Sequence, residues 1–203
     1  MVTNPSTTDP GWEILARVAA GEVEAFSSLV EAHQQRLLRL CERLLGEAEE
    51  ARDAVQEVFL KAYRKAASFH PQGQVYTWLY RIAVNHCLNR LRRRRLVQFT
   101  RLSPEPAEDV PAFDPPDGAP DPEAALVARR RWMATRKAIE RLPAGQRAVL
   151  VLVRFEGMSY RQVAETLQIT EGAVESRLFR AMRRLEAAQE EPLSQVSRGR
   201  GLT

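Results

Sequence analysis

Aromatic side chains lie beside an unbroken run of arginines in the stretch from Asp53 to Arg95. Six of the chain's fourteen aromatic residues fall in this stretch, and seven arginines but no acidic residue occur between Arg81 and Arg101. Arginine side chains bind phosphate groups, and aromatic rings stack on bases that have left a duplex. This combination predicts a surface that binds nucleic acid.

A helix that begins near Thr77 is expected to present this surface on one side. At helical spacing, one stripe combines an indole with amide and guanidinium groups: Trp78, Arg81, Asn85, Asn89 and Arg92. The arginines, continued by Arg93, Arg94 and Arg95, would hold phosphates, the amides would read base edges, and the indole would stack or wedge between bases. A solvated polar face is the alternative interpretation, but an indole is poorly suited to solvation alone.

The preceding helix is expected to have one apolar stripe and one polar side. The apolar stripe comprises Ala51, Ala54, Val55, Val58, Phe59, Ala62, Tyr63 and Ala66. This pattern places four polar residues together on the opposite, exposed side: Asp53, Gln56, Glu57 and Lys61. A loop from Ser68 to Val75, which contains Pro71 and Gly73, is expected to end this helix.

The composition changes abruptly between Ser103 and Glu123, where seven prolines and seven acidic residues occur without lysine or arginine. Proline stiffens the chain and acidic residues oppose burial, so a flexible, extended linker is expected. No alternating strand pattern persists elsewhere, which predicts an all-α protein of two small helical domains. The expected divisions are an N-terminal segment (1–19), a first domain (20–96), the linker (97–125), a second domain (126–188) and a disordered tail (189–203).

The second domain contains the pattern of a helix-turn-helix. Ser159 and Gln162 form a capping box for a short helix, and Thr170 can cap the helix after the turn. This last helix presents a polar side that suits the major groove of DNA: Ser176, Arg177, Phe179, Arg180 and Arg183. A purely structural hairpin is the alternative, against which the arginine-rich outer face argues.

The composition also excludes several classes of protein. No apolar run approaches the roughly 20 residues of a membrane helix, and the N-terminus lacks the layout of a secretory signal, so a cytoplasmic protein without membrane insertion is expected. Cys41 and Cys87 are too few for a disulfide framework and are expected to be reduced core residues. No Cys/His cluster has metal-ligand spacing, so neither a metal nor another cofactor is expected.

In their order and spacing, these patterns resemble the extracytoplasmic-function (ECF) sigma factors of bacterial RNA polymerase. The resemblance covers about residues 20–95 and 126–187. It is carried by AGEVEAFSSLVEAH, DAVQEVFLKAYRKAASF, YTWLYRIAVNHCLNRLRRRR and ERLPAGQRAVLVLVRFEGMSYRQVAETLQITEGAVESRLFRAMRRL. It implies a protein that binds core RNA polymerase and promoter DNA, is held inactive by an anti-sigma factor, and performs no catalysis itself.

The resemblance also implies roles for individual residues. Core polymerase is expected to bind Asp53, Gln56, Glu57 and Lys61. The minus-ten element is expected to be opened and read by Phe69, His70, Tyr76, Trp78, Arg81, Asn85, Asn89, Arg92 and Arg93. The minus-thirty-five element is expected to bind Ser176, Arg177, Phe179, Arg180 and Arg183. Glu175 departs from the family pattern, in which a basic residue is common here, and leaves the minus-thirty-five preference open.

Two rival functions belong to other classes. A helix-turn-helix repressor or activator that acts without core polymerase would need only the second domain, and it would leave the polar side around Gln56 and the Trp78 stripe unexplained. A nuclease would need acidic residues grouped with one another or with histidine at the spacing of a metal site, and neither helical domain shows such a group in its sequence. The sigma-factor interpretation accounts for both domains.

Overall fold

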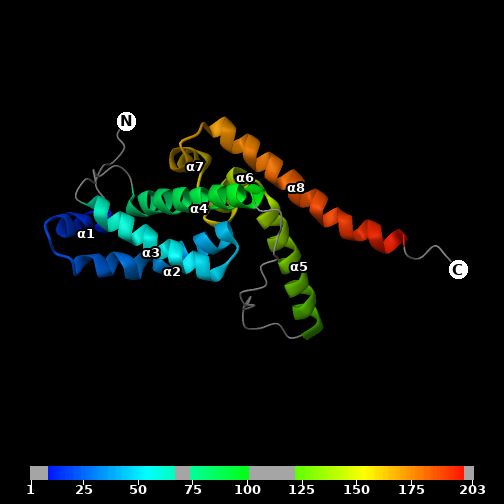
Figure 1. The fold of residues 1–203 in the computed structure, drawn as a ribbon, viewed down its shortest axis with the longest axis horizontal. Coiled ribbons are helices and arrows are strands. Elements are labelled where there is room, and N and C mark those ends of the chain that lie inside the picture. The colour runs from blue at the N-terminus through cyan, green and yellow to red at the C-terminus, as the bar shows by residue number, and fades with distance from the viewer. Residues whose placement is uncertain (1–8, 67–73, 101–121, 199–203) are drawn as a thin grey trace, which may run out of the picture. The chain divides into compact units, whose positions relative to one another are not determined.

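A computed structural model describes residues 9–66, 74–100 and 122–198. Within these ranges every regular element is a helix and no strand occurs, which confirms the all-α class (Figure 1). The chain divides into two compact units: the main boundary falls after Leu91, and Glu165–Gln168 are grouped with the first unit. The expected linker lies mostly in residues 101–121, outside the described ranges.

The first unit contains α1 (Pro10–Ala19), α2 (Ala25–Leu45), α3 (Ala48–Lys65) and the beginning of α4 (Val75–Thr100). Helices α2 and α3 lie side by side as an antiparallel pair (Figure 1). Gly46 separates them in the left-handed conformation, at a φ of 87°, and its N–H donates to the Glu42 carbonyl. A glycine suits this position because it adopts positive φ without a steric cost.

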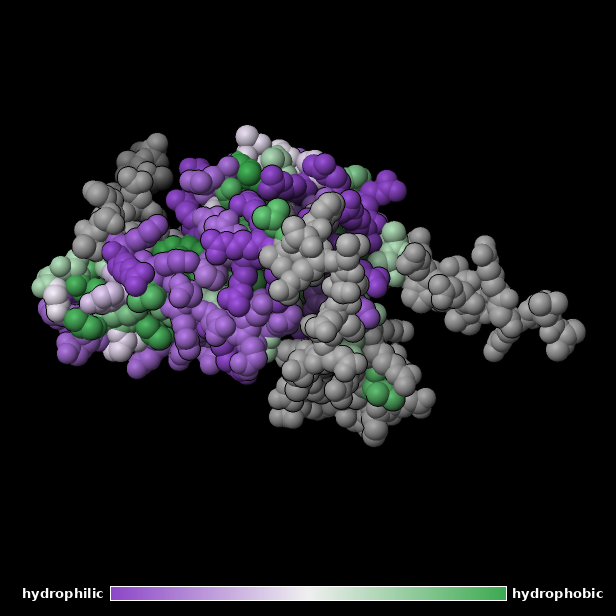
Figure 2. Space-filling model, in the orientation of Figure 1, coloured by the Kyte–Doolittle hydropathy of each residue, from purple (hydrophilic) through white to green (hydrophobic). Residues whose placement is uncertain are grey.

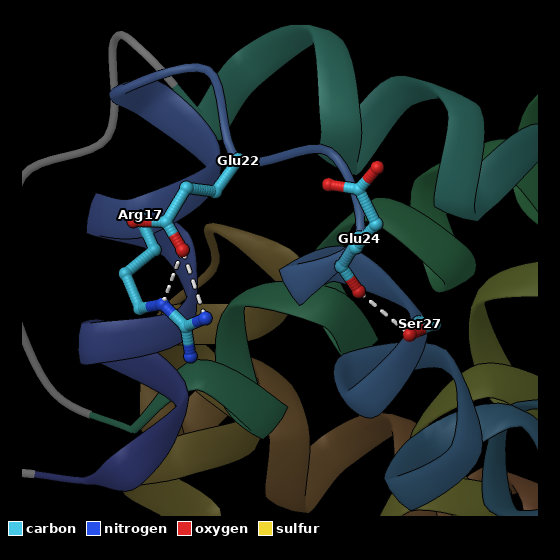
Figure 3. Close-up of polar contacts among 4 residues, drawn as sticks. All are labelled: Arg17, Glu22, Glu24 and Ser27. Carbon is cyan, nitrogen blue, oxygen red and sulfur yellow. Dashed lines mark hydrogen bonds and ion pairs between the residues drawn. The ribbon is translucent and has the colours of Figure 1, made fainter.

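The turn from α1 to α2 is closed by a second glycine and an ion pair. Gly21 has a φ of 100°, and the Glu22 N–H donates to the Arg17 carbonyl at 3.0 Å. The Arg17 guanidinium also donates to the Glu22 carboxylate, with Nε 2.8 Å from Oε2, as Figure 3 shows. In the first turn of α2, the Ser27 hydroxyl donates to the Glu24 carbonyl. Both side chains of the ion pair are exposed, so its contribution to stability is at most about 1 kcal/mol.

The core of the first unit is built mainly from leucine, valine and alanine. Its largest fully buried side chains are Leu15, Leu29, Leu37, Leu40, Leu44, Val58, Val75, Leu79 and Val84. Leu15 and the buried Val18 belong to α1, so the segment before residue 20 contributes a helix to this core. Sequence reasoning did not find this role.

The apolar stripe of α3 is buried as expected, apart from its seventh member. Tyr63 remains 38% exposed because it lies at the edge of the core, where its ring meets Phe26 edge-to-face with the centroids 5.4 Å apart. Phe26 makes a second edge-to-face contact with Phe59 at 6.2 Å. Such contacts add to the burial of apolar area in holding α2 against α3.

The two cysteines are free and fully buried, as the sequence predicts. The structure adds that the Sγ atoms of Cys41 on α2 and Cys87 on α4 lie 3.7 Å apart. Contact with Cys87 and burial raise the pKa of the Cys41 thiol. A neutral, inaccessible thiol reacts slowly with oxidants and alkylating reagents, so this pair acts as core packing.

The second unit contains α5 (Pro122–Arg141), α6 (Ala144–Leu150), the π-helix η2 (Val151–Phe155), the beginning of α7 (Tyr160–Leu167) and α8 (Glu171–Arg198). Its fully buried side chains include Leu142, Val149, Leu152, Val163 and Val174. Gly157 ends the segment after η2 in the left-handed conformation, with a φ of 67°. Helix α8 continues to Arg198, whereas the sequence predicted a disordered tail from residue 189 onward.

The two expected caps of the helix-turn-helix are present. The Ser159 N–H donates to Gln162 Oε1 at 2.9 Å, and the Gln162 N–H donates to Ser159 Oγ at 3.3 Å. The Ala173 N–H donates to Thr170 Oγ1 at 3.2 Å at the start of α8. Between the two helices, Gln168 adopts a positive φ of 54°, which makes the tight turn. These local bonds satisfy N–H groups that have no partner within the helix.

Hydrophilic residues cover much of the described surface that is seen in Figure 2. Across residues 9–66, 74–100 and 122–198, no helix combines the length and apolar character needed to cross a membrane.

Candidate functional surfaces

The first candidate surface is the polar side of α3. Asp53, Gln56 and Glu57 are all exposed there, on the side opposite the buried stripe. Leu60 lies one turn further along the same side and is 42% exposed. We name these four residues the α3 face. Its combination of an apolar side chain with polar neighbours is typical of a protein–protein interface. Sequence reasoning missed Leu60, although its spacing from Gln56 and Glu57 places it on this side.

Lys61 departs from the α3 face. Its side chain is half-buried, and Nζ lies 2.6 Å from Nδ1 of His86 on α4. Because an ammonium group only donates, this contact requires the Nδ1 atom of a neutral imidazole as the acceptor. Lys61 therefore joins α3 to α4, instead of extending freely from the exposed side.

Arg90 on α4 reaches back to α3. Its Nε atom lies 3.5 Å from Glu50 Oε2, and its Nη2 atom lies 3.8 Å from Asp53 Oδ2. The side chain of Arg90 is only 33% exposed in this position, and it pairs with both carboxylates. One consequence is that Asp53 is held by α4 at the edge of the α3 face.

The second candidate surface is the stripe on α4. Asn85, Asn89 and Arg92 are exposed, and Trp78 and Arg81 are half-buried. The helix buries its other side through Leu79, Ala83 and Cys87. Three of the five stripe residues therefore face solvent, on the side opposite the buried residues. We name these five stripe residues the α4 stripe.

Further arginines and a tyrosine accompany the α4 stripe. Arg93 and Arg95 are exposed and Arg94 is half-buried, so the arginine run extends the positive charge along α4. Tyr76, in the first turn, makes an edge-to-face contact with Tyr80 at 5.9 Å. The helix begins at Val75, before the expected Thr77. Phe69 and His70, which were also expected at this site, lie outside the described residues.

The third candidate surface is the outer side of α8. Ser176, Phe179, Arg180 and Arg183 are exposed, and Phe179 shows 63% of its surface to solvent. The Arg180 side chain lies along the helix and contacts the preceding turn. Its Nη2 donates to Ser176 Oγ at 2.9 Å, and its Nε donates to the Ser176 carbonyl at 3.1 Å. We name these four residues the α8 face. Its guanidinium groups, hydroxyl and exposed ring can contact both phosphates and base edges.

Arg177 lies apart from the α8 face. It is half-buried, and its guanidinium lies so close to Gly145 that a Cβ there would be 3.4 Å from Nη1. The helix packs inward through Val174, Leu178, Ala181 and Leu185, which are buried, while Met182 is only half-buried. Ala181, together with Val174, Leu178 and Leu185, therefore forms the inner side of α8.

A buried arginine joins α6 to the end of α5 in the second unit. Arg147 on α6 is 6% exposed and donates to the carbonyls of Glu140 and Leu142 at the end of α5. Burial lowers its pKa, and the nearby Glu140 carboxylate opposes that change. The Arg147 cation donates to carbonyls that lack a partner within the helix. The negative end of the helix dipole also favours a positive charge at this position. Its role is to hold α5 against α6.

No group of three or more His, Cys, Asp or Glu side chains able to hold a metal ion occurs in the part of the chain that the structure describes. The chemistry of the three surfaces is that of hydrogen bonding, stacking and charge attraction. They are suited to binding macromolecules.

Two family models match the chain in the order in which the candidate surfaces occur. Sigma-70 region 2 matches residues 29–97, which include the α3 face and the α4 stripe. Sigma-70 region 4 matches residues 132–185, which include the α8 face.

Curated relatives align over most of their own length. The RNA polymerase sigma-H factor of Pseudomonas aeruginosa is 36% identical over 188 residues, which are 90% of this chain and 95% of that protein. The ECF RNA polymerase sigma factor SigM of Mycobacterium tuberculosis is 38% identical, with coverages of 85% and 81%. The ECF RNA polymerase sigma-E factor of Escherichia coli is 34% identical, with coverages of 83% and 88%.

Two solved structures are similar to the fold. One is CnrH in complex with the cytosolic domain of CnrY, with a TM-score of 0.62, 26% identity and coverages of 90% and 99%. The other is the sigma factor RpoE in complex with the anti-sigma factor NepR from Bartonella quintana, with a TM-score of 0.63, 26% identity and coverages of 81% and 96%.

Proposed function

The chain belongs to the ECF sigma factors of RNA polymerase, and we propose from this that it assembles with core polymerase and directs it to specific promoters. The observation that carries the proposal is the occurrence of both sigma-70 regions, in order, in one chain. A repressor or activator with a helix-turn-helix would require the second region alone. Catalysis then belongs to the polymerase, and the cytoplasm, where the polymerase works, is the proposed location.

The α3 face is the proposed contact with core polymerase. Its acidic and amide groups provide directional hydrogen bonds, and Leu60 provides an apolar centre that becomes buried on binding. Such centres contribute most of the binding energy of protein interfaces, whereas the polar rim contributes orientation. Lys61 is proposed to act indirectly, because its contact with His86 holds α3 on α4.

The α4 stripe is the proposed site of minus-ten recognition and strand opening. An extruded base loses stacking worth a few kcal/mol, which a protein offsets by stacking and hydrogen bonding in its own site. Trp78 supplies the aromatic surface, and Asn85 and Asn89 supply groups for base edges. Arg92 and Arg93 are proposed to bind the phosphates that flank that site.

The α8 face is the proposed contact with the minus-thirty-five element. Arg180 is suited to guanine, and the Phe179 ring to thymine methyl groups, because these are the contacts that the major groove offers to such side chains. Glu175 is also exposed, next to Ser176, and is proposed to accept from the amino group of a cytosine. Arg177 contributes by fixing α8 against α6.

The isolated protein is expected to bind promoter duplex weakly at physiological salt, and the assembled holoenzyme tightly. Each DNA-binding surface is small, and binding both promoter elements at once requires core polymerase to hold them at promoter spacing. Linking two such contacts raises affinity by roughly 10²–10⁴-fold. Gel shifts with and without core polymerase, followed by run-off transcription, measure this. Tight, sequence-specific binding by the free chain would favour the repressor function instead.

An anti-sigma factor is the proposed regulatory partner. One structural neighbour is CnrH bound to the cytosolic domain of CnrY, and the other is a sigma factor bound to an anti-sigma factor. The proposed mode of inhibition is coverage of the α3 face, which would block access to polymerase. Co-purification from uninduced cells tests this, since repeated recovery of the free chain with constitutive transcription would contradict it.

A further inference from the structure

A single carboxylate joins the beginnings of two helices that are distant in sequence. Asp9, the N-cap of α1, accepts from the Gly11 N–H through Oδ1 at 2.9 Å. Its other oxygen, Oδ2, accepts from the Val75 N–H at 2.8 Å, across 66 positions of sequence. Val75 is the first residue of α4. The side chain of Asp9 thus caps both α1 and α4.

A close approach at Gly11 accompanies these bonds. A Cβ atom at Gly11 would lie 2.9 Å from both Cβ and Cγ2 of Val75, whose side chain is fully buried. Contacts this short require one helix to move, because the Val75 side chain is packed on all sides. Glycine therefore allows the first turn of α1 to lie directly against the first turn of α4. We name the contacts among Asp9, Gly11 and Val75 the N-terminal clasp.

The N-terminal clasp acts on a part of α4 that needs an external partner. The first N–H groups of a helix have no acceptor within it, and the positive end of the helix dipole favours a carboxylate. Without Oδ2, the first turn of α4 would fray or begin later. Tyr76 follows Val75 directly, and Trp78 lies within the same turn. Fraying would therefore change where the phenol and the indole point.

We propose that Asp9 and Gly11 are positioning residues for promoter opening, because they fix the first turn of α4 and with it Tyr76 and Trp78. This rests on the proposed function of the α4 stripe. The family model that covers the stripe begins at residue 29, so the clasp adds a contribution from a segment that precedes the matched region. Asp9 and Gly11 touch no DNA in this proposal and act only through α4.

Asp9→Ser is the variant that separates the two caps. Serine is as good an N-cap as aspartate, so α1 keeps its own cap. Serine has only one side-chain oxygen, however, and an oxygen that accepts from the Gly11 N–H cannot also reach the Val75 N–H. Glu13→Gln is the matched control, since Glu13 is an exposed acid in the first turn of α1 and its replacement removes the same charge. Gly11→Ala opens the clasp differently: it keeps Asp9, but its Cβ would lie 2.9 Å from Val75 Cβ and 3.2 Å from Asp9 Oδ1.

Asp9→Ser should lower initiation on duplex promoters roughly tenfold, which is the effect of losing one hydrogen bond to a charged group. On templates that carry a pre-melted bubble, the same variant should initiate almost normally. Gly11→Ala should follow the same pattern, and Glu13→Gln should match wild type. Amide hydrogen exchange at Val75 should accelerate in Asp9→Ser while binding to core polymerase is unchanged.

Other outcomes overturn the proposal. Wild-type initiation on duplex by Asp9→Ser would show that the bond to Val75 is dispensable. Equal losses on duplex and bubble templates, or weaker core binding, would assign the clasp to stability of the fold. If the wild-type chain itself fails to initiate with core polymerase on either template, the proposed function is wrong. Unchanged amide hydrogen exchange at Val75 in Asp9→Ser would separately refute the role of the clasp.

Discussion

We expect binding to core RNA polymerase to be abolished when Gln56 is replaced by alanine and Glu57 by lysine, while helical content stays unchanged. Both side chains are exposed on the α3 face, so their replacement leaves the core of the first unit intact. Reversing a charge at the centre of an interface costs about 2–5 kcal/mol, which corresponds to roughly 30- to several-thousand-fold in affinity. Titration with labelled core polymerase measures the loss, and far-ultraviolet circular dichroism measures the helix.

A matched control is Glu31→Lys, which makes the same charge reversal at an exposed position of α2. It should bind core polymerase with the affinity of the wild-type chain. Leu60→Ala should show a smaller loss than the double variant, because burial of one leucine side chain is worth about 1.5–3 kcal/mol. Undiminished core binding by the Gln56/Glu57 variant would exclude the α3 face as the polymerase contact.

We expect strand opening to depend on the α4 stripe and binding to intact duplex to depend on the α8 face. Asn85→Ala is expected to lose most initiation on duplex promoters and to recover it on templates with a pre-melted bubble, because its amide is proposed to act on an extruded base. Arg180→Ala is expected to weaken binding to both templates, since loss of a good base contact in the major groove costs about 1–3 kcal/mol. Run-off transcription from paired duplex and bubble templates distinguishes the two patterns.

Asn85 is well suited to this experiment because it is exposed, whereas Trp78 is half-buried and its truncation also disturbs packing. Gln35→Ala, an exposed amide on α2, is the matched control and should initiate normally on both templates. If a bubble fails to rescue Asn85→Ala, the α4 stripe serves core binding or folding, and the assignment to melting is wrong.

Local features of this fold could be read from the sequence because they depend on residues three or four positions apart. The Ser159 and Gln162 capping box and the Thr170 cap formed as expected, since each bond joins a side chain to a backbone group in the next turn. The burial of α3 on one side followed from its apolar period. For the same reason, the exposure of Gln56, Glu57 and Asn85 was predictable.

Contacts between distant segments could be found only from the tertiary structure. Helical periodicity sets which side of a helix is apolar, but it does not state which helix packs there or which polar groups meet at the edge of the contact. The Lys61 contact with His86 and the pairing of Arg90 with Asp53 depend on how α3 lies against α4.

The sequence by itself therefore determined the all-α class, the apolar side of α3 and the family, because these depend on spacing and order along the chain. Tertiary structure alone decided that Asp9 caps α4 and that α1 supplies Leu15 to the core. An N-cap side chain normally serves its own helix, and no local pattern indicates that its second oxygen accepts from a residue 66 positions away. That bond exists only because packing brings the beginnings of α1 and α4 together.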